Sequence, residues 1–240
     1  MTSDELAWLA DTCPYLAPAY LHYMKSFRLR PAEQVTLDFV PNDGKEDDNA
    51  YGALHMSTKG LWLETILYEI PLLALTSEAY FKFCDRDWTY DQQFERARDK
   101  GLRLQEHGCV VSEFGSRRRR DYHTQDLVLQ GLVASIKEAQ QRGYKGKISG
   151  TSNVHFARKF GLPPIGTVAH EWFMGIAAIT DNAMGSSEVA LRYWIGAFGR
   201  GVRFCPPDVH KIVARLTAQS GPGHRTDRHI RHARLPPGLS

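Results

Sequence analysis

The first hundred residues carry alternating stretches of helical and strand-like apolar spacing. Apolar side chains that recur every three or four residues indicate amphipathic helices, whereas strict alternation of apolar and polar side chains indicates a half-buried strand. Thr2 or Ser3 can cap the first helix, and Pro71 is expected to interrupt the second. The predicted elements are helices over 3–25, 61–83 and 90–105, and strands over 34–40 and 50–60.

From residue 109 onward, short apolar runs alternate with helix-like stretches. The predicted strands are 109–115, 147–153 and 164–170, and the predicted helices are 124–143, 154–161, 171–180 and 186–199. Strands that alternate with helices form parallel sheets with right-handed crossovers, which fits either a doubly wound sheet or the start of a (β/α)₈ barrel. Both folds bind ligands at the carboxyl ends of their strands, so functional residues are expected there.

The composition is that of an ordinary globular protein, with 42% hydrophobic residues, 24% charged residues and a net charge of +3. The best apolar run, 70–75, is far shorter than the roughly 18 residues of a membrane span. The amino terminus lacks the basic region of a signal peptide. The sequence contains no Cys-x-x-Cys pair, so a structural zinc site is not indicated. Reduced thiols fit a cytoplasmic protein, with the nucleus as a second location.

Small hydroxyl residues follow glycine at each predicted strand end. The three sites are Gly115-Ser116-Arg117, Gly150-Thr151-Ser152 and Gly166-Thr167. Such turns offer backbone N–H groups and hydroxyls to an anion, and the following helix adds the positive end of its dipole. Phe114, just before the first glycine, can stack on an aromatic ligand or pack in the core. The convergence of these turns predicts a site for an anionic ligand.

Four consecutive arginines, Arg117 to Arg120, follow the first of these strands. An arginine at the mouth of a buried strand suits a carboxylate or phosphate, because its planar guanidinium offers two parallel donors. Arg117 is therefore the candidate anion ligand. The other three arginines are left open between a subunit interface and pairing with nearby acidic residues. A nucleic-acid-binding module is disfavoured, since the basic residues are not interleaved with exposed aromatic ones.

His170 and Glu171 lie at the end of the third predicted strand. The zinc-protease motif His-Glu-x-x-His is incomplete here, because Met174 occupies the position of the second histidine. An imidazole at a strand end, beside a carboxylate, can act as a general base or as a phosphoryl acceptor. We therefore treat His170 as a catalytic candidate.

Four long stretches resemble nicotinate phosphoribosyltransferases of the fungal and bacterial type. They are "GLWLETILYEIPLLALTSEAYF", "EFGSRRRRDYHTQDLVLQGL", "GTSNVHFARKFGLPPIGTVAHEW" and "SSEVALRYWIGAFG", within a resemblance that runs from about residue 1 to about 201. The resemblance implies formation of nicotinate mononucleotide and pyrophosphate from nicotinate and phosphoribosyl pyrophosphate (PRPP), in NAD salvage. It further implies ATP as a co-substrate that phosphorylates a histidine, Mg²⁺, a homodimer, and no nucleic-acid or membrane partner.

The resemblance also implies roles for the residues that match the family's motifs. His170 would be the phosphohistidine, beside Glu171. Thr167 would contact nicotinate, Arg117 would bind the nicotinate carboxylate or a PRPP phosphate, and Phe114 would face the pyridine ring. The residues that would line the same mouth are Thr151, Ser152 and Asn153.

The implied fold is α/β: part of an N-terminal α/β domain joined to part of an irregular α/β barrel of the type II phosphoribosyltransferase kind. The corresponding ranges are 1–107 for the first domain, 108–201 for the barrel part and 202–240 for a divergent basic tail, expected to be disordered. A (β/α)₈ barrel takes roughly 250 residues. We therefore expect an incomplete barrel that lacks the Mg²⁺ ligands and the PRPP phosphate loops.

The sequence departs from the family pattern at both ends. A family segment with a stacking tyrosine would precede residue 1, and "RFCPPDVHKIVARL" replaces an apolar strand after Gly201. The 240-residue chain is therefore expected to be truncated, marginally stable alone and without measurable synthesis. An alternative hypothesis is an inactive fragment that pairs with or regulates a full-length subunit.

Overall fold

The structure is a computed structural model that describes residues 1–42, 44, 50–167, 169–181 and 184–198. The chain divides into two compact units, Met1–Ile165 and Gly166–Ser240. The predicted disordered tail over 202–240 lies outside the described residues. No helix within the described ranges is long and apolar enough to cross a membrane.

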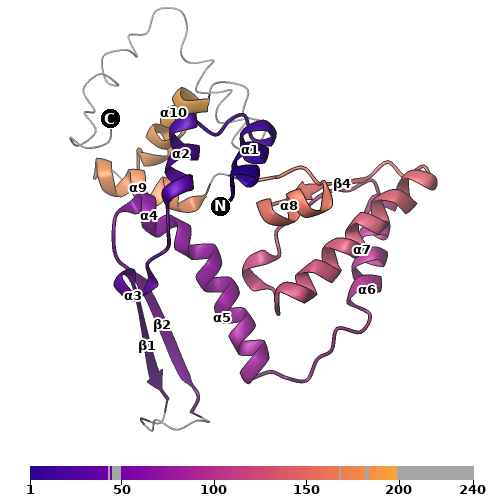
Figure 1. Ribbon diagram of the computed structural model, residues 1–240, viewed down its shortest axis with the longest axis horizontal. Helices are drawn as coiled ribbons and strands as arrows, with labels where there is room; N and C mark the ends of the chain where they lie inside the picture. The colour runs from indigo at the N-terminus through magenta and orange to yellow at the C-terminus, as the bar shows by residue number, and fades with distance from the viewer. Residues whose placement is uncertain (43, 45–49, 168, 182–183, 199–240) are drawn as a thin grey trace, which may run out of the picture. The chain divides into compact units, whose positions relative to one another are not determined.

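The amino-terminal elements are three short helices and a β-hairpin (Figure 1). In chain order they are α1 (Ser3–Thr12), α2 (Pro18–Ser26), α3 (Pro31–Gln34), β1 (Val35–Pro41) and β2 (Gly52–Thr58). Thr2 and Glu5 form the capping box of α1, as the sequence predicted for Thr2. The predicted helix over 3–25 is divided, because Pro18 begins a second helix. The two predicted strands are confirmed as an antiparallel pair.

The long helix α5 (Glu69–Phe83) follows α4 (Trp62–Thr65) and the 3₁₀ turn η1 (Ile66–Tyr68). The predicted interruption at Pro71 is wrong. Pro71 lies in the first turn of α5, where the backbone N–H groups have no acceptor within the helix, so the missing N–H of proline breaks no helical bond. The break falls at η1 instead, where buried Tyr68 accepts a hydrogen bond from the Arg30 amide (2.6 Å) and donates one to Gln34 Oε1 (2.9 Å). These bonds anchor the start of α5.

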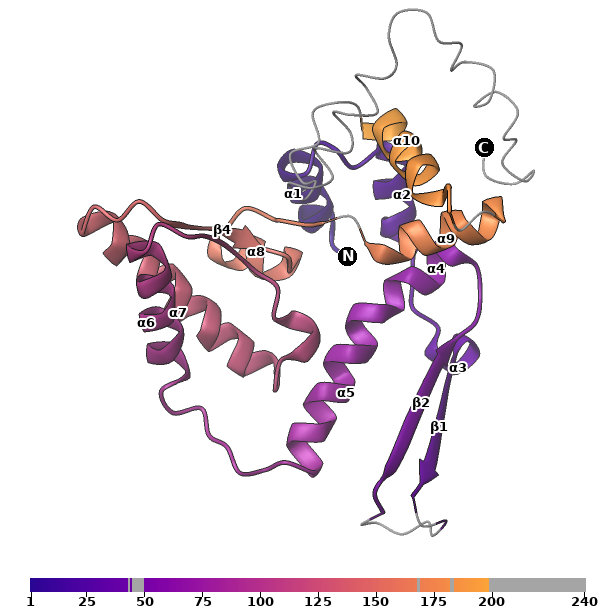
Figure 2. The same cartoon turned by 180° about the vertical axis from the view of Figure 1, so that it is seen from behind.

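Helices α6 (Gln93–Glu106) and α7 (Tyr122–Gln141) lie side by side in both views (Figures 1 and 2). Two glycines permit this close packing. A Cβ on Gly131 would lie 2.3 Å from the Phe94 carbonyl oxygen, and one on Gly101 would lie 2.5 Å from Ser135 Oγ. Buried Gln105 joins the helices by donating to the Ser135 hydroxyl at 3.0 Å. The predicted helices over 90–105 and 124–143 are thereby confirmed.

Strand β3 (Val110–Glu113) pairs in parallel with β4 (Lys147–Thr151), and α7 forms the crossover between them. Helix α8 (Val154–Phe160) follows β4 and ends at Gly161, whose φ of 64° is left-handed. Its Phe156 packs with Leu129 and Leu162 in the core. The strand–helix–strand–helix order predicted for this region is confirmed.

The third predicted strand, over 164–170, is wrong. Among the described residues of this range, only an isolated bridge between Thr151 and Pro164 forms, supported by a hydrogen bond from the Ile165 amide to the Thr151 carbonyl (2.9 Å). Pro163 and Pro164 have no N–H to donate, which prevents a regular ladder. The sheets within the described residues are two-stranded and form no closed barrel, in agreement with the predicted incomplete barrel.

The second unit contains α9 (His170–Thr180) and α10 (Ser186–Phe198), which confirms both predicted helices. The two helices pack through aromatic side chains. The Trp172 indole donates a hydrogen bond to the Ala190 carbonyl (3.0 Å), and its ring meets Trp194 edge to face at a centroid distance of 6.4 Å. The carboxyl end of α9 turns at Asp181, with a left-handed φ of 48°.

Asp121 caps α7, and its replacement tests how this crossover helix is held. Its carboxylate accepts from the Thr124 amide (2.6 Å) and from the Tyr90 hydroxyl. Burial raises the pKa of this carboxyl, but the bonds from Tyr90 and Thr124 outweigh burial and leave the pKa below its usual value. Asp121→Ala should lower the free energy of unfolding by about 1 kcal/mol at neutral pH.

The effect should depend on pH in one direction. Because the folded pKa is lowered, the ionic part of the stabilisation is present above the unfolded pKa and disappears as the pH falls through the folded pKa. Urea denaturation at pH 7 and near pH 3 measures both values. Asp121→Asn, which keeps a cap acceptor, is the control and should lose less. Equal losses for Ala and Asn would contradict the cap.

Candidate active site

A buried carboxylate closes strand β3. Glu113 is 8% exposed, and its Oε2 accepts a hydrogen bond from the Thr151 hydroxyl at 2.6 Å. Its Oε1 accepts from the Gln125 side chain at 2.8 Å and from the Gly115 amide. The carboxylate therefore ties together β4, α7 and the loop after β3. The sequence analysis missed Glu113, although a charged residue at the end of an apolar run is itself a signal.

The residues after β4 join this network. Thr151 is 0% exposed, and its hydroxyl also accepts from the Asn153 amide at 3.2 Å. The Asn153 side chain caps α8 through the Phe156 amide (3.2 Å) and donates to Ser116 Oγ at 2.9 Å. Half-buried Ser152 donates its amide to the Glu113 carbonyl at 2.9 Å. The two strand-end loops are thus bonded to each other, while substrate contacts of Thr151, Ser152 and Asn153 stay predictions.

The two Gly-Thr pairs differ in their surroundings. Gly150 has a φ of +155°, and a Cβ there would lie 2.1 Å from the Pro163 carbonyl oxygen. Only glycine permits this close approach of two backbone segments. Gly166 has no heavy atom within 4 Å of the equivalent position, and Thr167 is exposed. Packing therefore requires glycine at position 150 and does not require it at position 166.

Phe114 and Arg117 are the accessible members of the site. Phe114 is 48% exposed, which leaves its ring open to a ligand. The Arg117 side chain is 37% exposed, and its Nη1 donates to a carboxylate oxygen of Glu69 at the start of α5. The sequence analysis did not anticipate this acidic partner, because it lies 48 positions away along the chain.

The rest of the arginine run also lies along α5. Arg119 Nη2 is 4.0 Å from Glu78 Oε2, and the Arg120 guanidinium lies 5.2 Å from the ring centroids of both Phe81 and Trp88. Of the two alternatives left open for these arginines, pairing with an acidic residue of the same chain is the one observed for Arg119. Arg118 is exposed.

His170 is the first residue of α9, so its predicted place at a strand end is wrong. Its side chain is 73% exposed, and Nε2 lies 3.2 Å from Glu171 Oε1. Thr167, His170 and Glu171 belong to the second unit, whereas the residues around Glu113 belong to the first. Within the described part of the chain, His, Cys, Asp and Glu form no group of three that could hold a metal ion.

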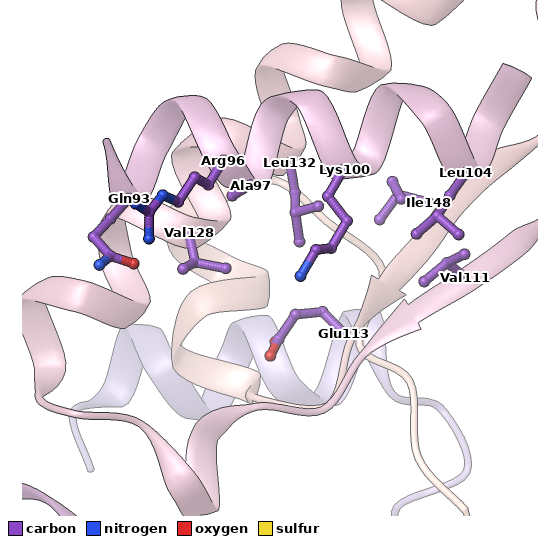
Figure 3. A pocket seen from close by; sticks show the side chains of 10 residues that line it. All are labelled: Gln93, Arg96, Ala97, Lys100, Leu104, Val111, Glu113, Val128, Leu132 and Ile148. Atoms are coloured by element: carbon purple, nitrogen blue, oxygen red, sulfur yellow. The ribbon is translucent and has the colours of Figure 1, made fainter. Parts of the chain in front are cut away.

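A hollow of about 420 Å³ opens between α6, α7, β3 and β4 (Figure 3). Apolar side chains form most of its walls, Glu113 lies at one side of it, and Arg96 and Lys100 extend into it from α6. None of the site residues predicted from the sequence lines it. The hollow therefore adjoins the buried carboxylate without being part of the predicted ligand site.

Models of one enzyme family match most of the chain. The model of the nicotinate phosphoribosyltransferase N-terminal domain covers residues 1–77, and the nicotinate phosphoribosyltransferase family model covers residues 109–204. A probable nicotinate phosphoribosyltransferase of Schizosaccharomyces pombe is 47% identical over 198 residues, which cover 82% of this chain and 45% of that protein. The chain belongs to the nicotinate phosphoribosyltransferase family.

Solved structures of nicotinate phosphoribosyltransferases share its fold. A crystal structure of a putative member from Saccharomyces cerevisiae matches with a TM-score of 0.76 at 43% identity, covering 82% of this chain and 47% of that one. The enzyme from Porphyromonas gingivalis matches with 0.68 at 34% identity, covering 82% and 46%. The chain spans about half the length of the curated relatives it matches. The predicted family is confirmed, and the alternative of a regulatory fragment has no support.

Thr151→Val tests the strand-end network. The substitution keeps the shape of the side chain but leaves Glu113 Oε2 without its donor in the interior. An unsatisfied buried acceptor costs about 1–3 kcal/mol, so the free energy of unfolding should fall by that amount. Thr151→Ser retains the hydroxyl and is the matched control. Urea denaturation of both variants provides the measurement, and a Val variant as stable as the Ser variant would argue against the network.

Proposed function

We propose that the site at the carboxyl ends of β3 and β4 serves the formation of nicotinate mononucleotide and pyrophosphate from nicotinate and PRPP, in NAD salvage. The observation that carries the proposal is the pair of accessible side chains, Phe114 and Arg117, on a loop within the family match over 109–204. The names of the relatives give the same reaction class.

Nicotinate is a flat aromatic ring that carries a carboxylate. In the proposed complex the Arg117 guanidinium binds the carboxylate, or a phosphate of PRPP, through parallel N–H donors. The Phe114 ring faces the pyridine ring. Ser152 and Asn153 contribute further polar contacts, and a nicotinate contact of Thr167 rests on the resemblance alone. Thr151 acts indirectly. Its buried hydroxyl donates to Glu113, and this bond fixes the loop that carries both ligand-binding side chains.

We further propose that His170 accepts a phosphoryl group from ATP. The 3.2 Å contact between Nε2 and Glu171 favours the tautomer with the proton on Nε2, which leaves the lone pair on Nδ1. Nδ1 then attacks the γ-phosphorus, the bond to the β-phosphate oxygen breaks, and ADP leaves. Glu171 stabilises the charge that develops on the ring. A homodimer and a cytoplasmic or nuclear location are further proposals that rest on the resemblance.

The proposal is tested by binding and by product formation. Nicotinate binding to the 240-residue chain is measured by calorimetry. Product formation from nicotinate, PRPP and ATP is measured by mass spectrometry, with the chain itself and with a chimera. In the chimera, residues 1–201 replace the matching part of the Schizosaccharomyces pombe relative. We expect the 240-residue chain to bind nicotinate and the chimera to form product. The proposed function would be contradicted if the chain did not bind nicotinate and a folded chimera formed no product.

Arg117→Lys tests the anion contact. Lysine keeps the charge but replaces the planar pair of donors by a single ammonium. Losing a charge-assisted hydrogen bond costs about 1.5–3 kcal/mol, so the dissociation constant of nicotinate or of PRPP should rise roughly ten- to a hundredfold. Calorimetry measures both constants, and exposed Arg118→Lys is the neighbouring control. Wild-type constants for both substrates would remove Arg117 from the site.

His170→Asn tests the phosphoryl acceptor. Asparagine cannot form the phosphoramidate, so labelling of the protein by γ-labelled ATP should disappear. The label on the wild type should be acid-labile and stable in base. His107→Asn, at the carboxyl end of α6, is the control and should keep full labelling. Acid-labile label on the His170 variant would assign the acceptor elsewhere.

A further inference from the structure

The loop that carries Arg117 is held against α5 by charged side chains. Arg117 contacts Glu69 at the first residue of the helix, and Arg119 lies 4.0 Å from Glu78, nine residues further along. Arg120 continues the row by lying over the ring of Phe81. Helix α5 belongs to the amino-terminal part of the fold, whereas the arginines follow directly after β3. These contacts therefore connect the amino-terminal part of the fold to the strand-end site.

The backbone at Glu69 is held in place independently of Arg117. Glu69 follows Tyr68, whose buried hydroxyl is bonded to Gln34 and to the Arg30 amide. Its position in the first turn of α5 places a carboxylate at the positive end of the helix dipole, which stabilises the charge. Glu69 thus offers an acceptor on an anchored helix start to a longer and more flexible side chain.

The contact with Glu69 occupies only one nitrogen of Arg117. Nη1 donates to the carboxylate, whereas Nε and Nη2 have no hydrogen-bond partner within the described ranges of the chain. These two nitrogens form the other edge of the guanidinium, a pair of parallel donors that matches a carboxylate or phosphate. The side chain is also partly open to solvent. The edge left over by Glu69 is therefore a two-donor site for an anion.

We propose that Glu69 is a positioning residue for Arg117, which it holds so that the Nε–Nη2 edge receives the anionic group of the substrate. This inference rests on the proposed function. The physical gain is preorganisation, because a guanidinium already fixed at one nitrogen loses less rotational freedom when it binds. Glu69→Ala should weaken anion binding about three- to tenfold, which corresponds to immobilising one long side chain.

The test reads Arg117 directly by chemical modification of the 240-residue chain. Phenylglyoxal reacts with accessible arginines, and peptide mass spectrometry reports the rate at Arg117. The rate is measured with and without nicotinate or inorganic phosphate as the protecting anion, for the wild type, Glu69→Ala, Glu69→Gln and Glu78→Ala. The Gln variant keeps an acceptor for Nη1, and the Glu78 variant breaks the other ion pair along α5. Glu69→Met replaces the Ala variant if the latter does not fold.

In the wild type and in Glu78→Ala, we expect at least one of the two anions to slow modification of Arg117. In Glu69→Ala that anion should be needed at about three- to tenfold higher concentration for the same protection, and Glu69→Gln should recover most of it. No protection in the wild type, equal protection in Glu69→Ala, or a Gln variant as weak as the Ala variant would overturn the inference. Product formation plays no part in this test, so its failure and that of the proposed function are distinguishable.

Discussion

The buried carboxylate of Glu113 is the constraint on which the strand-end region depends. A charged group in the interior is tolerated only when its oxygens are hydrogen-bonded, and here the donors come from β4, α7 and the loop after β3. Each of these segments must therefore occupy one position relative to the others. The bond between Asn153 and Ser116 extends the same constraint from one loop to the next.

Around this carboxylate, buried polar groups hold the frame and other side chains of the candidate site are open to solvent. Thr151, one of the residues predicted to line the site, is fully enclosed, and its hydroxyl donates to Glu113. Phe114 follows Glu113 directly and Arg117 lies four positions after it, and both side chains are at least partly open to solvent. This separation is useful for binding, because a ligand-facing side chain is precise only when the backbone beneath it is fixed by other groups.

The arginine run has a different meaning in the structure than its composition suggests. Three of its members contact residues of α5 through two carboxylates and an aromatic ring, so the run fastens one segment of the fold to another. Only part of the guanidinium surface of Arg117 remains for a ligand. A dense basic run next to a strand end therefore attaches one segment to another, and in Arg117 this attachment uses only one nitrogen of the guanidinium.

Long stretches of the sequence carried the resemblance that identified the family. Local patterns predicted most of the helices and the β3–α7–β4–α8 order, because periodic burial and capping are properties that each segment carries in its own residues. The sequence also predicted a ligand site at the strand ends, which stays a prediction. The error at 164–170 came from giving apolar spacing more weight than Pro163-Pro164, which remove the donors that a ladder needs. The predicted break at Pro71 was also wrong, and the helix is interrupted at η1 instead. Proline is tolerated in the first turn, because a backbone N–H at that position has no partner within the helix.

Only the tertiary structure decided which polar residues are internal supports and which are accessible. Glu113 with Gln125, and Arg117 with Glu69, are pairs separated by 12 and 48 positions. No local pattern encodes such pairs, since they arise when α5, α7 and the strands come together and each buried charge must find a partner. The sequence supplied several candidate groups, and three-dimensional packing showed which of them are buried supports and which are accessible.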